Sequence, residues 1–273
     1  MNPHSPAGLV ASGSVIQSPF ARLPALLDRL GPVKSGSLRL ASRVSNGLGA
    51  GHPVSHYADL ADAPVVVVIA PDEEVPKLAL ELAGSGIDWK GKTAMLAGTW
   101  LGSSSLAPLA ARGAETVTLC HAESPAEERC LVEGSRAGVN EAKRLLLDSG
   151  FRVIVVEPED KPLVLAALTF AEALIFPLMA AAEECLRAAH VPSLEAGGIV
   201  QRAVARGARA YGKSRRKAWD GPLARRNAPL MRNQLEAAER ADPRTALLLS
   251  QSARQALEYF GADTKWFPAP PAK

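Results

Sequence analysis

The chain has 273 residues, of which 47% are hydrophobic and 22% are charged, and these values exclude a largely disordered chain. The formal net charge of +3 is too small to indicate a nucleic-acid-binding protein by itself. The three cysteines fit no metal-binding spacing, so we predict no metal site. The chain does not open with a basic segment followed by a long apolar one, and we expect a cytoplasmic protein.

Short apolar runs alternate with helical stretches over residues 1–158. Residues 8–11 predict a first strand, and the alternating residues 37–42 predict a second. Residues 63–72 contain four consecutive valines, which is typical of a strand buried on both faces of a parallel sheet. Further strands are predicted at 92–98, 115–121, 129–134 and 151–157, and helices at 73–84, 103–113 and 138–150. This alternation predicts an α/β fold with a Rossmann-like parallel sheet.

The pattern after residue 158 is entirely helical. Residues 159–190 predict one long helix, kinked at Pro177, and three more helices follow at 194–212, 229–241 and 243–261. We therefore expect a dinucleotide-binding domain over 1–158 and a helical domain over 159–273. Residues 162–182 are apolar enough for a membrane span, but Glu172 lies at their centre, so we predict a helix buried in protein and no membrane.

The turn after the first strand is a modified dinucleotide-binding turn. The usual three glycines permit a tight turn, a close approach to the diphosphate and close packing of helix on strand. Here the three slots hold Ala11, Gly13 and Ile16, so only the second glycine is kept. We expect the backbone of Gly13, Ser14 and Val15 to hold a diphosphate if a dinucleotide binds.

Other candidate residues follow from the ends of the predicted strands, where α/β folds bind ligands. Ser42 and Arg43 suit the 2′-phosphate of NADP, although Arg43 could equally be a solvated surface residue. Ala70, Pro71 and Asp72 end the valine-rich strand and are candidate cofactor contacts; Asp72 could instead cap the next helix. His121 ends another strand and is the candidate general acid or base.

Two charged features belong to the helical half. Glu172 must be paired, protonated or facing a cleft if its helix is buried, and it is a second catalytic candidate. Residues 202–226 carry nine basic residues opposed only by Asp220. They could bind nucleic acid, an anionic substrate or only water; no nucleic-acid motif accompanies them, so we expect no nucleic-acid partner.

The layout resembles the 6-phosphogluconate-dehydrogenase-like superfamily, which includes ketopantoate and pyrroline-5-carboxylate reductases. Residues 57–75, 106–114, 158–174 and 220–227 are most similar to a bacterial branch described as NADP oxidoreductases. The resemblance implies a Rossmann domain, a helical domain that forms a homodimer, and NADP as cofactor, with NAD a weaker candidate. It carries Arg225 over as a contact to substrate or phosphate.

The sequence also departs from that branch. Ala97 precedes Gly98, a candidate substrate contact, where the branch has serine, and Ala122 follows His121 where it has proline. Leu165 and Ala173 occupy the slots of a histidine and an asparagine that face the cleft in the branch. Two hypotheses remain: an NADP-dependent oxidoreductase acting on a small carbonyl, imine or hydroxy acid, or a non-catalytic Rossmann-fold dimer that acts as a binding protein.

Overall fold

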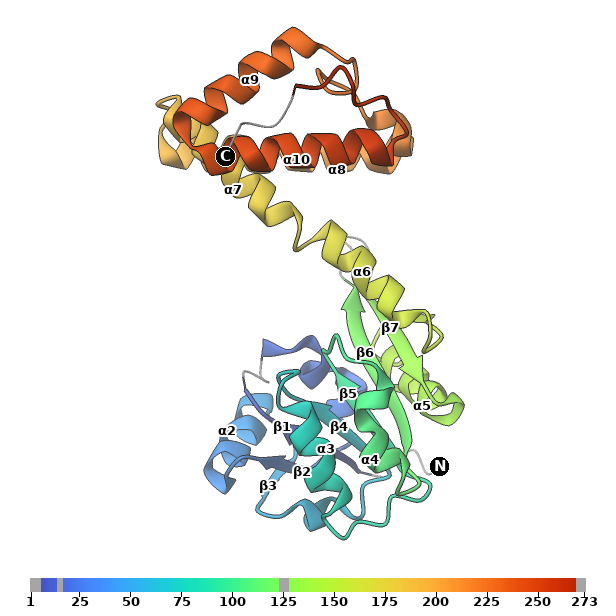
Figure 1. Ribbon diagram of the computed structural model, residues 1–273. Helices are drawn as coiled ribbons and strands as arrows, with labels where there is room; N and C mark the ends of the chain where they lie inside the picture. Colours follow the sequence, from blue (N-terminus) through green and yellow to red (C-terminus); the bar gives the residue numbers. More distant parts are fainter. Residues whose placement is uncertain (1–5, 14–16, 123–127, 269–273) are drawn as a thin grey trace. The chain divides into compact units, whose positions relative to one another are not determined.

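The computed structural model describes residues 6–13, 17–122 and 128–268 (Figure 1). The chain divides into two compact units, residues 1–166 and 167–273. The division lies beyond residue 158 because the first turn of the linking helix packs with the first unit, where Lys161 is buried.

The first unit is built on one eight-stranded sheet with the order β3-β2-β1-β4-β5-β6-β7-β8. All neighbouring strands are parallel except β6 and β7. The predicted α/β, Rossmann-like class is confirmed. The strands are β1 (Ala7–Ala11), β2 (Leu30–Ser35), β3 (His52–Val54), β4 (Val65–Ile69), β5 (Thr93–Ala97), β6 (Glu115–Ala122), β7 (Arg129–Gly134) and β8 (Arg152–Val155).

Helices cover both faces of this sheet (Figure 1). Apolar side chains of one face pack with η2 (Pro19–Arg22), α1 (Pro24–Leu27), α2 (Leu38–Leu48) and α5 (Arg136–Leu147). The other face packs with η3 (Tyr57–Leu60), α3 (Val75–Ala83), η4 (Ser103–Leu106) and α4 (Ala107–Ala110). Because both faces are covered, β4 can consist of four valines and an isoleucine, all buried.

The predicted second strand is wrong. Residues 38–48 form helix α2, and the strand lies earlier, at Leu30–Ser35. The Ser37 side chain caps α2 by accepting a hydrogen bond from the Leu40 backbone N–H (3.2 Å), and Gly49 ends the helix in the left-handed conformation. The alternation of 37–42 is therefore the start of a helical repeat that buries Ala41 and Val44.

The second unit consists of helices. The linking helix α6 (Lys161–Ala171) crosses the division between the units, and the helices α7 (Ile175–Ala188), α8 (Ser193–Ser214), η5 (Arg215–Ala218), α9 (Ala228–Ala241) and α10 (Pro243–Tyr259) follow. The core of this unit lies between α9 and α10, where Met231, Leu235 and Leu257 pack together.

The prediction of a single long buried helix over 159–190 is also wrong. The helix breaks at 172–174, and Pro177 lies in the first turn of α7, where a missing N–H breaks no helical hydrogen bond. The segment Lys161–Ala188 is long and apolar enough to cross a membrane, and its most apolar stretch is not buried within the chain. A single helix of this kind, identified by its length and composition only, is weak evidence for a membrane span.

Candidate functional site

Gly13 lies at the carboxyl end of β1 in the left-handed region, with φ of +70°. A Cβ atom at this position would lie 3.3 Å from Pro71 Cγ, at the end of β4. The adjacent Ser12 N–H donates to the Ile69 carbonyl (2.9 Å), which fixes the turn to the neighbouring strand. The structure therefore brings Gly13 and Pro71 together, and it keeps the backbone conformation that this turn needs. Ser14 and Val15 lie outside the described residues, as does Ile16.

A cavity of about 540 Å³ opens beside this turn, over the carboxyl ends of β1 and β2. Its lining includes the polar side chains of Lys34 and Ser35 on β2, of Ser12 just after β1, and of Tyr57 and Glu74, together with the apolar Val10, Ala11 and Leu78. Two more lining residues, Lys77 and Glu81, lie on α3. This is the crevice at which Rossmann-like sheets hold the adenosine half of a dinucleotide.

Several side chains that line this cavity form contacts within the protein. Ser35 Oγ donates to the Ala11 carbonyl (2.7 Å), and the Lys34 ammonium lies over the Tyr57 ring, 4.7 Å from its centroid. The Tyr57 hydroxyl donates to Glu81 (2.9 Å). Burial, together with this carboxylate, raises the pKa of Tyr57 to about 12. Ser35, Lys34 and Tyr57 therefore each contact another part of the protein at this cavity.

Because β2 lies at Leu30–Ser35 and not at 37–42, the residues that follow it, where a ribose would bind, differ from those predicted. Ser42 and Arg43 do not follow a strand; they lie within α2, and Arg43 is exposed there. The residues that do follow β2 are Gly36, Ser37, Leu38 and Arg39. Ser37 and Arg39, in the first turn of α2, thus take the place predicted for Ser42 and Arg43.

The segment after β1 differs most from a dinucleotide-binding fold. Such folds place the N-terminus of a long helix on the diphosphate. Here the described residues between Gly13 and β2 are in 3-10 conformation at Gln17 and at Pro19–Arg22, and the α-helix that follows, α1, has only four residues. Glu74 adds a carboxylate to this part of the site, since its Oε2 accepts a 2.5 Å hydrogen bond from Ser12 Oγ. The residues present fit the adenosine half of NADP better than the diphosphate.

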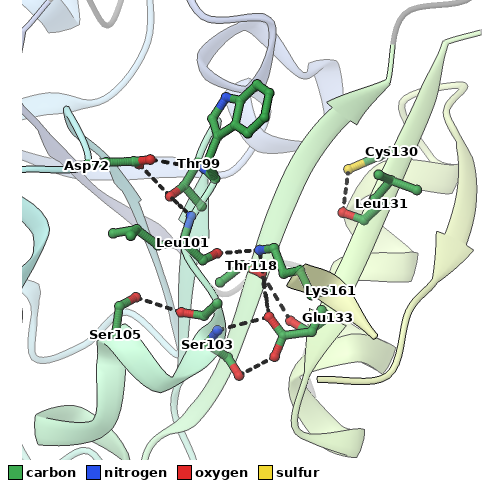
Figure 2. Close-up of polar contacts among 12 residues, drawn as sticks. Asp72, Thr99, Leu101, Ser103, Ser105, Thr118, Cys130, Leu131, Glu133 and Lys161 are labelled. Carbon is green, nitrogen blue, oxygen red and sulfur yellow. Dashed lines mark hydrogen bonds and ion pairs between the residues drawn. The ribbon is translucent and has the colours of Figure 1, made fainter. Parts of the chain in front are cut away.

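Asp72 connects the end of β4 to the loop after β5. Its carboxylate accepts hydrogen bonds from Thr99 Oγ1 (2.6 Å) and from the Trp100 backbone N–H (3.2 Å) (Figure 2). It does not cap α3, whose N-cap is Glu74. Ala70 is buried beside it, and Gly98, with φ of +75°, starts the loop. Asp72 and Gly98 therefore border the same carboxyl edge of the sheet.

His121 lies near the end of β6 in an aromatic surround. Its ring is 6.0 Å from the Phe20 ring and 5.8 Å from the Phe151 ring, and its Nε2 is 2.6 Å from Glu128 Oε2. Phe20 also faces Gly98, where a Cβ would lie 3.7 Å from Phe20 Cδ2. This arrangement places an imidazole ring next to the strand ends, with a carboxylate that can orient it.

A buried ionic cluster was missed by the sequence analysis. Lys161 and Glu133 are only 5% and 3% exposed, and their nitrogen and oxygen lie 3.7 Å apart. Glu133 comes from β7 and Lys161 from the start of α6. Burial lowers the pKa of the Lys161 ammonium, and the Glu133 carboxylate opposes that shift. Charged residues in an apolar strand and at a helix start were the available signal.

The remaining candidates lie in the second unit. Glu172 was predicted inside a buried helix, but it lies exposed in the turn between α6 and α7. The same turn holds Ala173, so Leu165 and Ala173 do not share one helix. Arg225 is exposed and forms a two-bonded ion pair with Asp220 (2.8 and 2.9 Å). This pairing raises the pKa of Arg225 and lowers that of Asp220. Its substrate contact stays a prediction.

The described residues contain no group of three or more metal-ligating side chains.

Comparisons with known proteins were made with the sequence and with the fold. Residues 129–256 match a family described as a domain of unknown function, DUF2520. The sequence matches no curated protein.

Solved structures match the fold over most of the chain. A candidate NADP oxidoreductase from Bacteroides fragilis has a TM-score of 0.70 at 15% identity, covering 94% of this chain and 99% of its own. A reductive aminase from Aspergillus terreus, solved with NADPH and ethyl-5-oxohexanoate, has a TM-score of 0.65 at 15% identity, covering 93% and 94%. A pyrroline-5-carboxylate reductase from Coxiella burnetii has a TM-score of 0.56 at 17% identity, covering 93% and 98%.

These matches confirm the predicted resemblance at the level of the fold. The chain thus carries a DUF2520 match over residues 129–256 and has the fold of NADP oxidoreductases, imine reductases and pyrroline-5-carboxylate reductases, a Rossmann-like sheet followed by helices.

Proposed function

We propose that this protein is a cytoplasmic oxidoreductase that binds NADP(H) at the carboxyl ends of β1, β2 and β4. It transfers hydride to or from a small carbonyl, imine or hydroxy acid. The observation that carries the proposal is the cavity of about 540 Å³, lined in part by serine, lysine, tyrosine and glutamate side chains, beside the left-handed Gly13. Structures of the same fold include complexes with NADPH and with NADP+, and one includes NAD+.

The preference for NADP rests on the residues after β2. An acidic residue there would bind the free 2′-hydroxyl of NAD, whereas arginine and hydroxyl groups suit a 2′-phosphate. No aspartate or glutamate occurs between Asp28 and Asp59, and Ser37 and Arg39 lie in the first turn of α2. These two residues would hold the 2′-phosphate, and the N-terminus of α2 adds a favourable dipole.

In this proposal His121 is the general acid or base. Bound nicotinamide supplies the hydride chemistry. His121 would exchange a proton with the substrate, and the Glu128 carboxylate, 2.6 Å from its Nε2, would orient the ring. Asp72 would act indirectly, because its oxygens already accept hydrogen bonds from Thr99 and Trp100.

The test is a titration of the purified protein with NADPH and NADH, comparing Arg39→Ala with Arg43→Ala. Both variants remove an exposed arginine from α2. We expect Arg39→Ala to weaken NADPH binding by about ten-fold or more, as for a lost charge-assisted contact, and to leave NADH binding unchanged. Arg43→Ala should bind NADPH like the wild type. Equal losses in both variants, or none in Arg39→Ala, would contradict the assignment.

A second candidate function is a Rossmann-fold binding protein that does not turn over substrate. The short helical segments after β1 and the carboxylate of Glu74 favour it, because both weaken a diphosphate site. A turnover assay distinguishes the oxidoreductase from the binding protein. NADPH that binds but is not oxidised with carbonyl or imine substrates, at any pH between 5 and 9, would favour the second candidate.

We also propose that the helical half pairs with a second copy of the chain. Phe170 and Phe176 are 69% and 67% exposed, and Leu174 and Leu178 are exposed beside them in sequence. Apolar surface of this kind on a folded chain marks an interaction site. Sedimentation analysis of the full chain, expected to give a dimer, tests this proposal.

A further inference from the structure

The loop Gly98–Gly102, between β5 and η4, is fixed on two sides. On one side, Asp72 accepts hydrogen bonds from Thr99 Oγ1 and the Trp100 N–H. Within the loop, the Leu101 N–H donates to Thr99 Oγ1 (2.9 Å). Thr99 is therefore held by its own loop and by Asp72, and it is only 1% exposed.

On the other side, the buried ionic cluster holds the end of the loop (Figure 2). The Lys161 ammonium donates to the Leu101 carbonyl. The Glu133 carboxylate accepts from the Ser103 backbone N–H (2.9 Å) and from Ser103 Oγ (2.5 Å). The two charged groups thus each contact a different residue of the same chain segment.

Thr118 completes the cluster from β6. Its hydroxyl accepts from the Lys161 ammonium (2.5 Å) and donates to Glu133 Oε2 (2.9 Å), and the side chain is fully buried. Glu133 accepts three hydrogen bonds from neutral donors, in addition to its ion pair with Lys161. These hydrogen bonds and the ion pair offset the cost of burying the Glu133 carboxylate, and they fix the positions of the groups that contact it.

The position of the cluster indicates what it does. The loop it holds carries Thr99 and Trp100, the two residues that contact Asp72 at the proposed cofactor edge. Neither Lys161 nor Glu133 lines the cavity beside Gly13. Both side chains are also nearly fully buried and bonded to Leu101 and Ser103, so the geometry supports a role through the loop and not a contact with the ligand.

We propose that Lys161 and Glu133 are positioning residues that lock the loop Gly98–Gly102 against Asp72 and so shape the nicotinamide side of the site. The consequence for cofactor binding rests on the proposed function. The locking of the loop does not, because it can be measured without any ligand.

The experiment is hydrogen exchange, read by mass spectrometry, on the full chain without ligand. Lys161→Met keeps the length of the side chain and removes the ammonium. We expect the amides of 100–103 to exchange about ten-fold faster or more, since a hydrogen bond to a charged group is lost, while β4 exchanges as in the wild type. Lys90→Met, at an exposed lysine, is the matched control and should change nothing in this segment.

Thr118→Val is the second variant, in case Lys161→Met fails to fold. It is nearly isosteric and removes one contact from each charged group, so it should speed exchange in the same segment by a smaller factor. If the segment exchanges as in the wild type in either folded variant, the locking role is wrong.

NADPH binding by the same variants is the second readout. If the loop loosens and NADPH affinity falls, both the locking role and the proposed function are supported. If the loop loosens but even the wild type does not bind NADPH, the locking role stands and the proposed function fails.

Discussion

Replacing Gly13 by alanine tests whether the single remaining glycine of the turn still serves a ligand. With φ of +70°, an alanine at this position pays the steric cost of the left-handed region, about 1–2 kcal/mol. The new Cβ would also lie 3.3 Å from Pro71 Cγ, which is closer than an ordinary contact. We expect Gly13→Ala to lower the free energy of unfolding of the first unit by about 1–2 kcal/mol.

Gly86→Ala is the matched control for this strain. Gly86 has φ of +80°, and its new Cβ would meet nothing within 4 Å. It lies in the connection from α3 to β5, which leads to the amino end of a strand and not to the carboxyl edge. Both alanine variants carry the strain of the left-handed region, and Gly13→Ala adds the contact with Pro71, so it should lose at least as much stability as Gly86→Ala. Only Gly13→Ala places a methyl group at the proposed diphosphate position.

Fluorescence titration with NADPH measures the affinity of each variant, and a thermal melt measures its stability. We expect NADPH affinity to fall by about ten-fold or more, equal to about 1.4 kcal/mol, in Gly13→Ala and to stay unchanged in Gly86→Ala. If both variants bind NADPH equally well, the diphosphate does not approach Gly13, and the assignment of this turn to the cofactor is refuted.

Other predictions concern the groups around the cavity and the exposed helices. Glu74→Gln removes a negative charge beside Ser12 and should strengthen NADPH binding by about two- to five-fold at low salt; weaker binding would show that the carboxylate supports the site. If the chain forms the proposed dimer, Phe176→Asp should convert it to a monomer in sedimentation analysis, and an unchanged dimer would exclude Phe176 from the interface. Since Tyr57 has its pKa raised to about 12, the folded protein keeps this proton where the unfolded chain has lost it, so stability should fall between about pH 10 and 12. Tyr57→Phe should show a smaller fall over that interval, and an equal fall would contradict the assignment.

The sheet was predictable because its central strands are buried on both faces. The valines of β4 and the residues AMLA of β5 have no polar alternation, which is the pattern of parallel strands. β2 was missed because its sequence, LGPVKS, contains glycine and proline, which are rare in strands. As a result, the second strand was predicted at residues that form α2, and Ser42 and Arg43 were wrongly predicted to lie at a strand end.

The site was less predictable than the sheet, since it depends on pairings between distant residues. Glu133 and Lys161 are 28 positions apart, and only the antiparallel pairing of β7 with β6 brings Glu133 opposite Thr118. The sequence contains no signal that predicts this pairing of β7 with β6. By contrast, Gly13, Pro71 and His121 were placed correctly at strand ends, because the positions of strand ends follow directly from a parallel α/β pattern.

The two halves of the proposed cofactor site have departed from the usual fold to different degrees. The adenosine half keeps a cavity with polar side chains, an arginine and the capped start of α2, whereas the described part of the diphosphate half has only short helical segments and a carboxylate. If the adenosine half supplies most of the affinity, adenosine 2′,5′-bisphosphate should bind within about ten-fold of NADPH. Arg39→Ala should then weaken both ligands equally. A fragment that does not bind, beside NADPH that binds tightly, would instead place the affinity in the diphosphate and nicotinamide, and the altered turn after β1 would have to be a working site of a different shape.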